Sequence, residues 1–357
     1  MRVLVTGATG LVGFETLDVL RRAGAEEVVG TSRAHSAAAA GLTAWDLAAE
    51  PPPRELRGSW DVIVHAAADT RWTMTPAEAV AANVDTVRAL EPLVGPGTHM
   101  VHVSTAYSTG LRGSVESESL DDYRNSYEWS KAHAERLARD VFPQLTIVRP
   151  PLIVGRSSDG YAARFTGMYT MLRAITASMV PVIVADADAY FEVVPVDAVA
   201  AVISEASQRA GAGETLIVAG GAEALRVGPA VELMTEALNA WRQARGLEPF
   251  EVPRLISRER WERFFYPFVR DELSARQRRI LSLLSNFEPY LEVHEPLEPT
   301  HQVGDLAEAI FAVARYWADT EPRRASMAPR PWTAAAGNDQ TVPWHGSPGQ
   351  LTREGSS

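Results

Sequence analysis

Short apolar runs alternate with amphipathic helical stretches through the first half of the chain. The runs that predict strands cover residues 2–6, 28–31, 42–45, 61–65, 100–103 and 145–148. A helix with Phe14, Leu17 and Leu20 on one face should follow the first strand and end near Gly24, and residues 126–141 predict another helix. Because these strands are apolar throughout, the alternation predicts a parallel sheet covered by helices on both faces.

The pattern loosens after Pro150. Residues 182–184, 192–194 and 215–218 predict short strands, and helices are expected near Val196 and Val227 and over residues 255–284 and 305–317. One helix start in the first half carries its own signal, with Thr75 as N-cap, Pro76 at the first helical position and Glu78 closing a capping box. The chain after residue 324 is rich in Pro, Gly, Ser and Ala, so we expect a flexible tail over residues 325–357.

Composition excludes several classes of protein. A net charge of −11 argues against a nucleic-acid partner, and the absence of cysteine excludes disulfides, thiolate metal sites and a cysteine nucleophile. We predict no metal site. The longest apolar stretch, residues 168–184, is broken by Arg173 and Pro181 and is shorter than the ~20 residues that span a bilayer. The first strand begins at the N-terminus and leads directly into a motif, so we expect no signal peptide and a cytoplasmic protein without a membrane span.

That motif is a glycine-rich turn, Gly7-Ala8-Thr9-Gly10-Leu11-Val12-Gly13, between the first strand and the first helix. Glycines there allow a tight turn and let the backbone approach a pyrophosphate, which the helix N-terminus stabilises. The predicted fold is therefore α/β, a doubly wound parallel Rossmann sheet with a smaller, mostly helical C-terminal substrate-binding region. We place the dinucleotide-binding domain at residues 1–180, with returning segments near 190–222, and the helical region at 223–322.

The end of the second strand indicates which dinucleotide is bound. An NAD site usually has an acidic residue there, whereas this chain has Ser32 and Arg33, which could hold a 2′-phosphate. NADPH is the predicted cofactor, and the alternative is that Arg33 faces water. Asp46 and Leu47, after the third strand, could contact the adenine, or Asp46 could cap the next turn.

Lys131 is the one lysine among the 34 Lys and Arg residues of the chain, and it lies four residues after Tyr127. Four residues apart on a helix, the two side chains share a face. Hydride transfer to a carbonyl leaves an oxyanion that needs a proton, which a phenol can supply. Bringing the phenol pKa from ~10 to neutrality needs about 3 units, or roughly 4 kcal/mol, which a nearby ammonium and a nicotinamide cation together could supply.

These motifs together resemble the extended short-chain dehydrogenase/reductases over about residues 1–220. Finer matches resemble thioester reductase domains and fatty acyl-CoA reductases: His65-Ala66-Ala67-Ala68 with Arg71-Trp72 and Asn83-Val84, residues 101–107, residues 127–132, residues 148–155, Val194-Pro195-Val196-Asp197 and Phe287-Glu288-Pro289-Tyr290. The resemblance implies that Tyr127 donates the proton, that Lys131 tunes it and binds the nicotinamide ribose, and that Thr105 hydrogen-bonds the carbonyl, with Ser104 as the neighbouring candidate. The implied cofactor-binding residues are Gly7, Thr9, Gly10, Leu11, Val12, Gly13, Ser32, Arg33, Asp46, Leu47, Ala66, Ala67, Ala68, Tyr127, Lys131, Pro150, Pro151 and Ile153.

The predicted function is NADPH-dependent reduction of an acyl thioester, bound to coenzyme A or to a carrier protein supplied in trans, to an aldehyde, which a second round could reduce to an alcohol. The alternatives are a ketone or aldehyde reductase, a nucleotide-sugar epimerase or dehydratase of the same superfamily, or a non-catalytic dinucleotide-binding sensor. We expect His65 to be structural. An arginine-rich run over residues 254–279 is interpreted as a solvated, acid-paired helix face, and the alternative is a dock for coenzyme A phosphates or an acidic carrier protein. Nearby aromatics (Trp261, Phe264, Phe265 and Phe268) are expected mostly in the core.

Overall fold

A parallel sheet forms one half of the molecule. The computed structural model describes residues 1–33, 41–177, 182–209, 213–271, 273 and 275–329. Across the sheet the strands run in the order β14 (His301–Gln302), β11 (Glu214–Ala219), β6 (Leu145–Arg149), β5 (His99–Val103), β4 (Val62–His65), β1 (Arg2–Thr6), β2 (Glu27–Ser32) and β3 (Thr43–Ala44). Every neighbouring pair is parallel. The doubly wound parallel sheet predicted from the sequence is confirmed.

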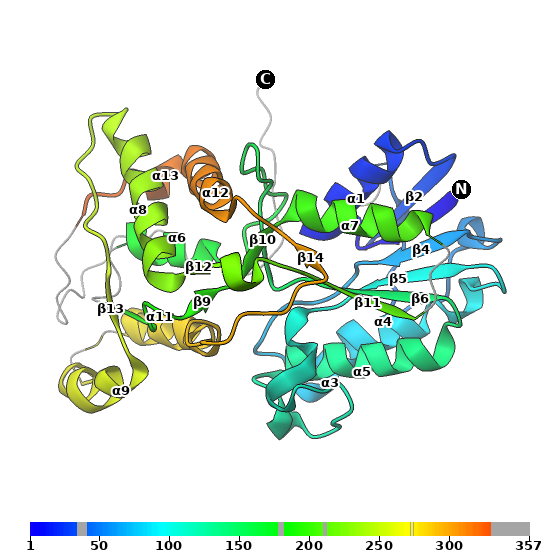
Figure 1. The fold of residues 1–357 in the computed structure, drawn as a ribbon, viewed down its shortest axis with the longest axis horizontal. Coiled ribbons are helices and arrows are strands. Elements are labelled where there is room, and N and C mark those ends of the chain that lie inside the picture. The colour runs from blue at the N-terminus through cyan, green and yellow to red at the C-terminus, as the bar shows by residue number, and fades with distance from the viewer. Residues whose placement is uncertain (34–40, 178–181, 210–212, 272, 274, 330–357) are drawn as a thin grey trace.

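Helices cover both faces of this sheet (Figure 1). Along one face lie α1 (Leu11–Arg22) and α7 (Val196–Gln208). Along the other lie α3 (Pro76–Ala79), the π-helical turn η3 (Val80–Val84), α4 (Asp85–Arg88) and α5 (Ser126–Val141). Short 3-10 turns connect the elements: η2 (Arg54–Leu56), η4 (Glu91–Leu93), η5 (Ala106–Arg112) and η6 (Leu120–Asp122).

Side chains alternate across the sheet and build a separate core on each face. Val3, Val5 and Val64 belong to the cluster under α1 and α7, whereas Leu4 and Ile63 belong to the cluster under α4 and α5. Both faces are buried, which is why most positions of these strands are apolar. Phe14 departs from its predicted place on the buried face of α1. It is 39% exposed, because its ring turns toward Tyr161 rather than the sheet.

The C-terminal half has its own hydrophobic core, packed between helices. The helices are α6 (Tyr169–Thr176), α8 (Val227–Gln243), α12 (Leu306–Thr320) and α13 (Pro322–Ala325). Three small two-stranded sheets join the segments: β7 (Leu152–Val154) with β10 (Val193–Pro195), β9 (Tyr190–Phe191) with β12 (Leu225–Arg226), and β8 (Val182–Val184) with β13 (Arg254–Ile256). The 3-10 turn η7 (Gly221–Glu223) precedes β12. The domain division near residue 180 stays a prediction; α6 packs within the C-terminal core.

The segment predicted as continuously helical, residues 255–284, is interrupted. It opens with β13, which pairs with β8, and continues as α9 (Arg258–Arg260), the π-helical turn η8 (Trp261–Phe265), α10 (Tyr266–Val269) and α11 (Ala275–Ser285). The 3-10 turn η9 (Glu288–Tyr290) follows. The prediction was wrong at its start because strand pairing with a segment 72 residues earlier is not visible in local periodicity.

The predicted flexible tail lies mostly outside the described residues, which end at residue 329. At its start the chain is fixed. Ala325 is fully buried, and its carbonyl accepts a hydrogen bond from Arg242 Nη1 at 2.5 Å. The start of the predicted tail, at residue 325, is therefore fixed against α8.

Candidate active site

The predicted site residues gather at the carboxyl edge of the sheet. Thr6 ends β1 and is in register with His65 at the end of β4, which is in register with His102 on β5. Ligands of open parallel sheets bind outside this edge. Pro150 and Pro151, which follow β6, lie beside the same edge, and Ala106 N donates to Pro150 O at 2.8 Å.

The glycine turn has the shape of a cradle that side chains would fill. A Cβ at Gly7 would lie 2.7 Å from Ala67 Cα, so the turn after β1 rests directly on the loop after β4. A Cβ at Gly13 would lie 2.3 Å from Gly7 O. Gly10 caps α1 without a side-chain hydrogen bond, which leaves the first backbone N–H groups for an anionic ligand. These residues fit a dinucleotide pyrophosphate.

Ser32 and Arg33 lie at the end of β2, as the sequence predicted. Ser32 is buried, and its hydroxyl shares a 2.8 Å hydrogen bond with Thr9 Oγ1 of the glycine turn. The Arg33 side chain is exposed, and its charge helps to lower the pKa of Asp69, whose main partner is Arg71. A cation therefore lies at the end of β2, next to the serine that contacts the glycine turn.

Arg164 was missed by the sequence analysis. Its Nε donates to Thr9 O at 3.1 Å, which places a second guanidinium group at the glycine turn. No local motif marks this arginine, because 155 residues separate it from its partner.

The remaining predicted cofactor residues take different places. Leu47 is buried in the core beneath the sheet, and Asp46 starts a turn in which its carbonyl accepts from Ala49 N and Glu50 N. Leu11, Val12, Ala66 and Ile153 are partly buried and pack against core clusters at the strand ends, and Ala68 is exposed in the loop after β4.

Helix α5 carries Tyr127 and Lys131 on one face. Asn125 is its N-cap, and Asn125 Oδ1 accepts from Glu128 N at 3.0 Å. Lys131 is 1% exposed, and its Nζ donates to Val103 O at 2.7 Å and lies 3.5 Å from His102 Nε2. An ammonium has three N–H donors, so these contacts leave one for a ribose hydroxyl.

Burial controls the protonation of this pair. It lowers the pKa of Lys131 to about 8, against the opposing charge of Glu135. Burial, followed by the charge of Glu128, raises the pKa of Tyr127 above its ordinary value. Burial is therefore the largest influence on the phenol pKa in the structure, and the expected lowering by the ammonium together with the nicotinamide cation stays a prediction. A phenol that keeps its proton is suited to act as an acid.

Two buried histidines lie behind Lys131. The rings of His65 and His102 stack with centroids 5.4 Å apart, and His65 Nδ1 shares a 2.8 Å hydrogen bond with Thr6 Oγ1. Burial and then the charge of Lys131 lower the pKa of His65 to about 3, and they lower the pKa of His102 as well. Both rings are neutral near pH 7, in agreement with the expected structural role of His65.

Ser104 and Thr105 end β5 but have different surroundings. Ser104 Oγ donates to the buried Glu135 Oε1 at 2.5 Å, and Glu135 is also bridged by Arg149. Thr105 Oγ1 accepts only a long 3.4 Å contact from Tyr107 N among the described residues. The Thr105 hydroxyl is thus the one that can still donate to a substrate.

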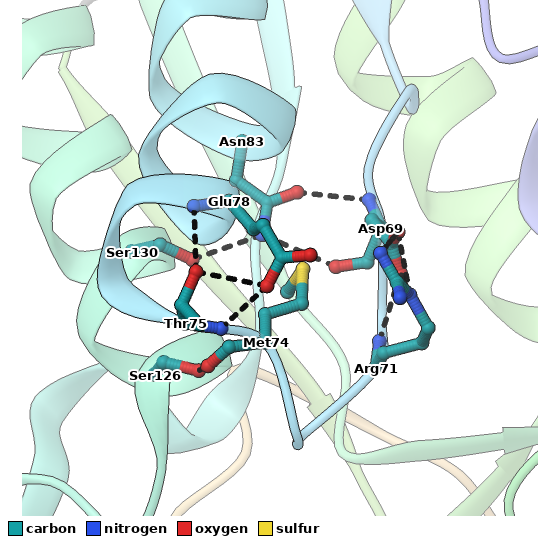
Figure 2. A network of polar contacts seen from close by, with 8 residues as sticks. All are labelled: Asp69, Arg71, Met74, Thr75, Glu78, Asn83, Ser126 and Ser130. Carbon is teal, nitrogen blue, oxygen red and sulfur yellow. Dashed lines mark hydrogen bonds and ion pairs between the residues drawn. The ribbon is translucent and has the colours of Figure 1, made fainter.

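Asn83 ties the loop after β4 to α5 (Figure 2). It lies in the π-helical turn η3, where its amide exchanges hydrogen bonds with the Asp69 backbone and donates to Ser130 Oγ at 2.9 Å. Ser126 Oγ donates to Met74 O at 2.6 Å. The predicted capping box of Thr75 and Glu78 is confirmed and starts the helix that carries Asn83.

An apolar cavity of about 300 Å³ lies in the C-terminal half. Its lining includes Met171, Ile183, Trp261, Leu284, Phe287 and Leu291. The Phe287 ring also contacts Trp72, with centroids 4.5 Å apart, in the loop that Asn83 fixes. The expectation that the aromatics of this segment lie mostly in the core holds for Trp261, which is buried. Phe264 and Phe268 are 64% and 78% exposed.

Several arginines of the 254–279 run are paired with acids. Arg258 bridges Glu288 and Glu292, and Arg263 bridges Glu259. The interpretation of an acid-paired surface fits these residues. In the described part of the chain, no group of His, Asp or Glu side chains could hold a metal ion. None of the helices described there has the length and apolar character that crossing a membrane requires.

Comparisons with known proteins agree with the fold. Residues 49–203 match the NAD-binding family model described as "Male sterility protein". Among solved structures, the terminal R domain of the myxalamid PKS-NRPS biosynthetic pathway has a TM-score of 0.65 at 20% identity and covers 92% of each chain. The PhqB reductase domain from Penicillium fellutanum has a TM-score of 0.62 at 18% identity and covers 90% of this chain and 93% of its own.

An epimerase shares the fold to a similar degree. The UDP-N-acetylglucosamine 4-epimerase from Methanobrevibacter ruminantium has a TM-score of 0.60 at 13% identity, and the alignment covers 89% of this chain and 98% of that enzyme. No curated protein sequence matches the chain. At identities this low, the structural similarity establishes the fold alone. The substrate has to be inferred from the chemistry of the site.

Proposed function

We propose, from the premise that this chain is an extended short-chain dehydrogenase/reductase, that it is an NADPH-dependent reductase of acyl thioesters. The observation that carries the proposal is that Tyr127 and the buried Lys131 lie four residues apart on α5, where burial raises the phenol pKa and keeps its proton in place. Lys131 lies against His102, which stacks on His65, and His65 bonds Thr6 directly before Gly7. This chain of contacts connects Lys131 to the start of the glycine turn and supports one site for both.

The residues of the chain divide the reaction between them. NADPH, when bound, supplies the hydride that reduces the thioester carbonyl carbon. Thr105 donates a hydrogen bond that orients the carbonyl oxygen, and Tyr127 gives that oxygen its proton. Lys131 holds a positive charge beside the phenolate that remains. The neutral hemithioacetal then breaks its C–S bond and releases an aldehyde and a thiol.

The apolar cavity supports an acyl substrate. Phe287 lines it and contacts Trp72 in the loop next to α5, so an apolar chain in the cavity would lie near the catalytic helix. Most of its lining side chains are aliphatic or aromatic, which suits an acyl chain better than a polar nucleotide sugar; the polar lining residues are Arg278, Ser282, Ser285 and Glu288. The thiol half is coenzyme A or a carrier protein supplied in trans. Reduction could continue from aldehyde to alcohol.

The test follows NADPH oxidation with acyl-CoAs, carrier-bound thioesters, aldehydes, ketones and nucleotide sugars. We expect turnover of a thioester with release of one thiol per aldehyde. Tyr127→Phe should lower kcat by about 10²- to 10⁴-fold, which is the usual contribution of a general acid. Turnover of ketones without any thioester, or epimerisation without net NADPH use, would refute the thioester assignment.

Cofactor choice is tested separately. Arg33→Ala should raise the KM for NADPH about tenfold and leave the KM for NADH nearly unchanged, because only NADPH carries the 2′-phosphate. The matched variant Arg21→Ala removes an arginine from the end of α1, away from the turn. An equal rise in the KM for NADPH and for NADH would contradict the assignment of Arg33 to the 2′-phosphate site.

A further inference from the structure

A short C-terminal segment returns to the start of the catalytic helix. Tyr290, at the end of η9, is 3% exposed and lies between the rings of Trp72 and Tyr107, with centroids 4.6 and 4.8 Å away. Its hydroxyl accepts from Asn125 Nδ2 at 2.8 Å and donates to Glu128 Oε1 at 2.5 Å. The two partners are 165 and 162 residues away in the sequence.

The two partners of this hydroxyl flank Tyr127. Asn125 caps α5, and Glu128 lies on the first turn of the helix with 0% exposure. The cap bond from Glu128 N to Asn125 Oδ1 closes a ring of three hydrogen bonds through Tyr290. Any rotation of the first turn of α5 must break this ring.

The buried Glu128 depends on that ring because its other partners are weaker. Arg124 reaches its carboxylate at 3.4 Å through the guanidinium and at 3.2 Å through the backbone N–H. The Arg124 guanidinium also lies over the rings of Tyr107 and Tyr290, 5.6 and 5.5 Å from their centroids. A buried carboxylate requires close donors, and the Tyr290 hydroxyl is the closest one here.

Other bonds hold the same turn from its opposite side. Ser126 is tied to Met74 and Ser130 to Asn83, as Figure 2 shows. These bonds come from the Rossmann half, whereas Tyr290 comes from the segment that lines the apolar cavity through Phe287. Hydrogen bonds from both halves of the molecule therefore hold the start of α5.

We propose that Tyr290 is a positioning residue, whose hydroxyl fixes Asn125 and Glu128 and thereby sets the orientation of the Tyr127 phenol. The proposal rests on Tyr127 being the proton donor, and it does not depend on the substrate being a thioester. A core tyrosine kept for packing alone would need only its ring. Here the hydroxyl bridges two polar side chains that immediately surround the acid.

The experiment uses Tyr290→Phe, which keeps both ring contacts and removes the bridge. We expect kcat to fall about 10- to 100-fold, because a small misplacement of a reacting group has effects of this size, while the KM for NADPH changes less than about twofold. Tyr123→Phe is the matched control. It removes a buried hydroxyl that donates to Ser117 O in the loop before α5 and touches neither Asn125 nor Glu128. It should retain kcat.

Rescue separates bridging from charge. Glu128→Gln keeps an oxygen that accepts from Tyr290, whereas Glu128→Ala removes it. Glu128→Gln should therefore keep severalfold more kcat than Glu128→Ala. Equal kcat in the two variants, or loss in Tyr123→Phe as large as in Tyr290→Phe, would overturn the proposal.

Amide hydrogen exchange provides a readout without turnover. In Tyr290→Phe the amides of Glu128 and Trp129, which bond to Asn125, should exchange about tenfold faster, with no change over residues 135–141. Unchanged exchange at these two amides refutes the bridge, whatever the activity. Faster exchange in a protein that reduces no thioester upholds the bridge and refutes only the thioester assignment.

Discussion

At the end of β5, the Ser104 hydroxyl donates to Glu135 at 2.5 Å, while Thr105 has only a long contact from Tyr107 N among the described residues. Ser108 and Arg149 donate hydrogen bonds to the same buried carboxylate. These partners lower the pKa of Glu135 and so keep it charged despite its burial. Adjacent hydroxyls thus have different surroundings: that of Ser104 donates to Glu135, and that of Thr105 donates to no partner among the described residues. The sequence named both and ranked Thr105 first by resemblance, and the position of Glu135 supplies the physical reason.

The ionisation of Lys131 predicts a pH dependence. Burial lowers its pKa to about 8, so the ammonium is present below pH 8 and is lost as the pH rises through that value. We expect kcat/KM for reduction to be level from pH 6 to 7 and to fall above about pH 8. The measurement is a pH–rate profile, since kcat/KM reports groups of the free enzyme.

Lys131→Arg is the control for this assignment, because a guanidinium stays charged at these pH values. Its activity should be low, and any remaining activity should lack the decline near pH 8. A wild-type profile that stays level up to pH 9.5 would contradict the role of the ammonium.

Among the elements, α1 and α5 depend on local signals that the sequence contains. Their boundaries follow from the glycine turn before α1 and from the Asn125 cap before α5. The π-helical turn at Asn83 and the strand β13 have no such signal. Both arise from contacts with distant segments, through Ser130 in one case and through β8 in the other.

Gly13 gives a prediction at the scale of these elements. In Gly13→Ala the new Cβ would lie 2.3 Å from Gly7 O, so α1 must move away from the glycine turn. We expect NADPH to bind at least about tenfold more weakly, equivalent to ~1.4 kcal/mol, as measured by calorimetric titration. Gly97→Ala is the control, because nothing lies within 4 Å of a Cβ there. Unchanged NADPH affinity in Gly13→Ala would argue against pyrophosphate binding at this turn.

At the scale of the whole molecule, the C-terminal half is closed by one buried arginine. Arg242, on α8, is 1% exposed and donates to the carbonyls of Glu248, Ala325 and Met327. Its guanidinium lies over the Phe250 ring, 4.0 Å from the centroid. The arginine holds the end of the described chain against α8, a contact that composition did not indicate.

Replacing this arginine should therefore destabilise the protein. Arg242→Met leaves three carbonyls without their donor, and we expect the free energy of unfolding to fall by about 2–4 kcal/mol. Denaturant titration followed by circular dichroism measures the loss. Arg245→Met, which removes an exposed ion pair between Asp319 and an arginine just after the end of α8, should cost under about 1 kcal/mol. Similar losses in both variants would contradict the role of Arg242.

The sequence by itself determined the parallel sheet, the glycine turn and the Tyr127–Lys131 face, because each depends on residues close together in the chain. Only the tertiary structure decided that burial keeps the proton on Tyr127, that Ser104 belongs to Glu135, and that Arg164 and Tyr290 reach the site. These features depend on segments up to 165 residues apart and on the loss of water around charged groups. A local sequence pattern reveals neither the long-range contacts nor the loss of water, because both depend on which surfaces pack together in the folded chain.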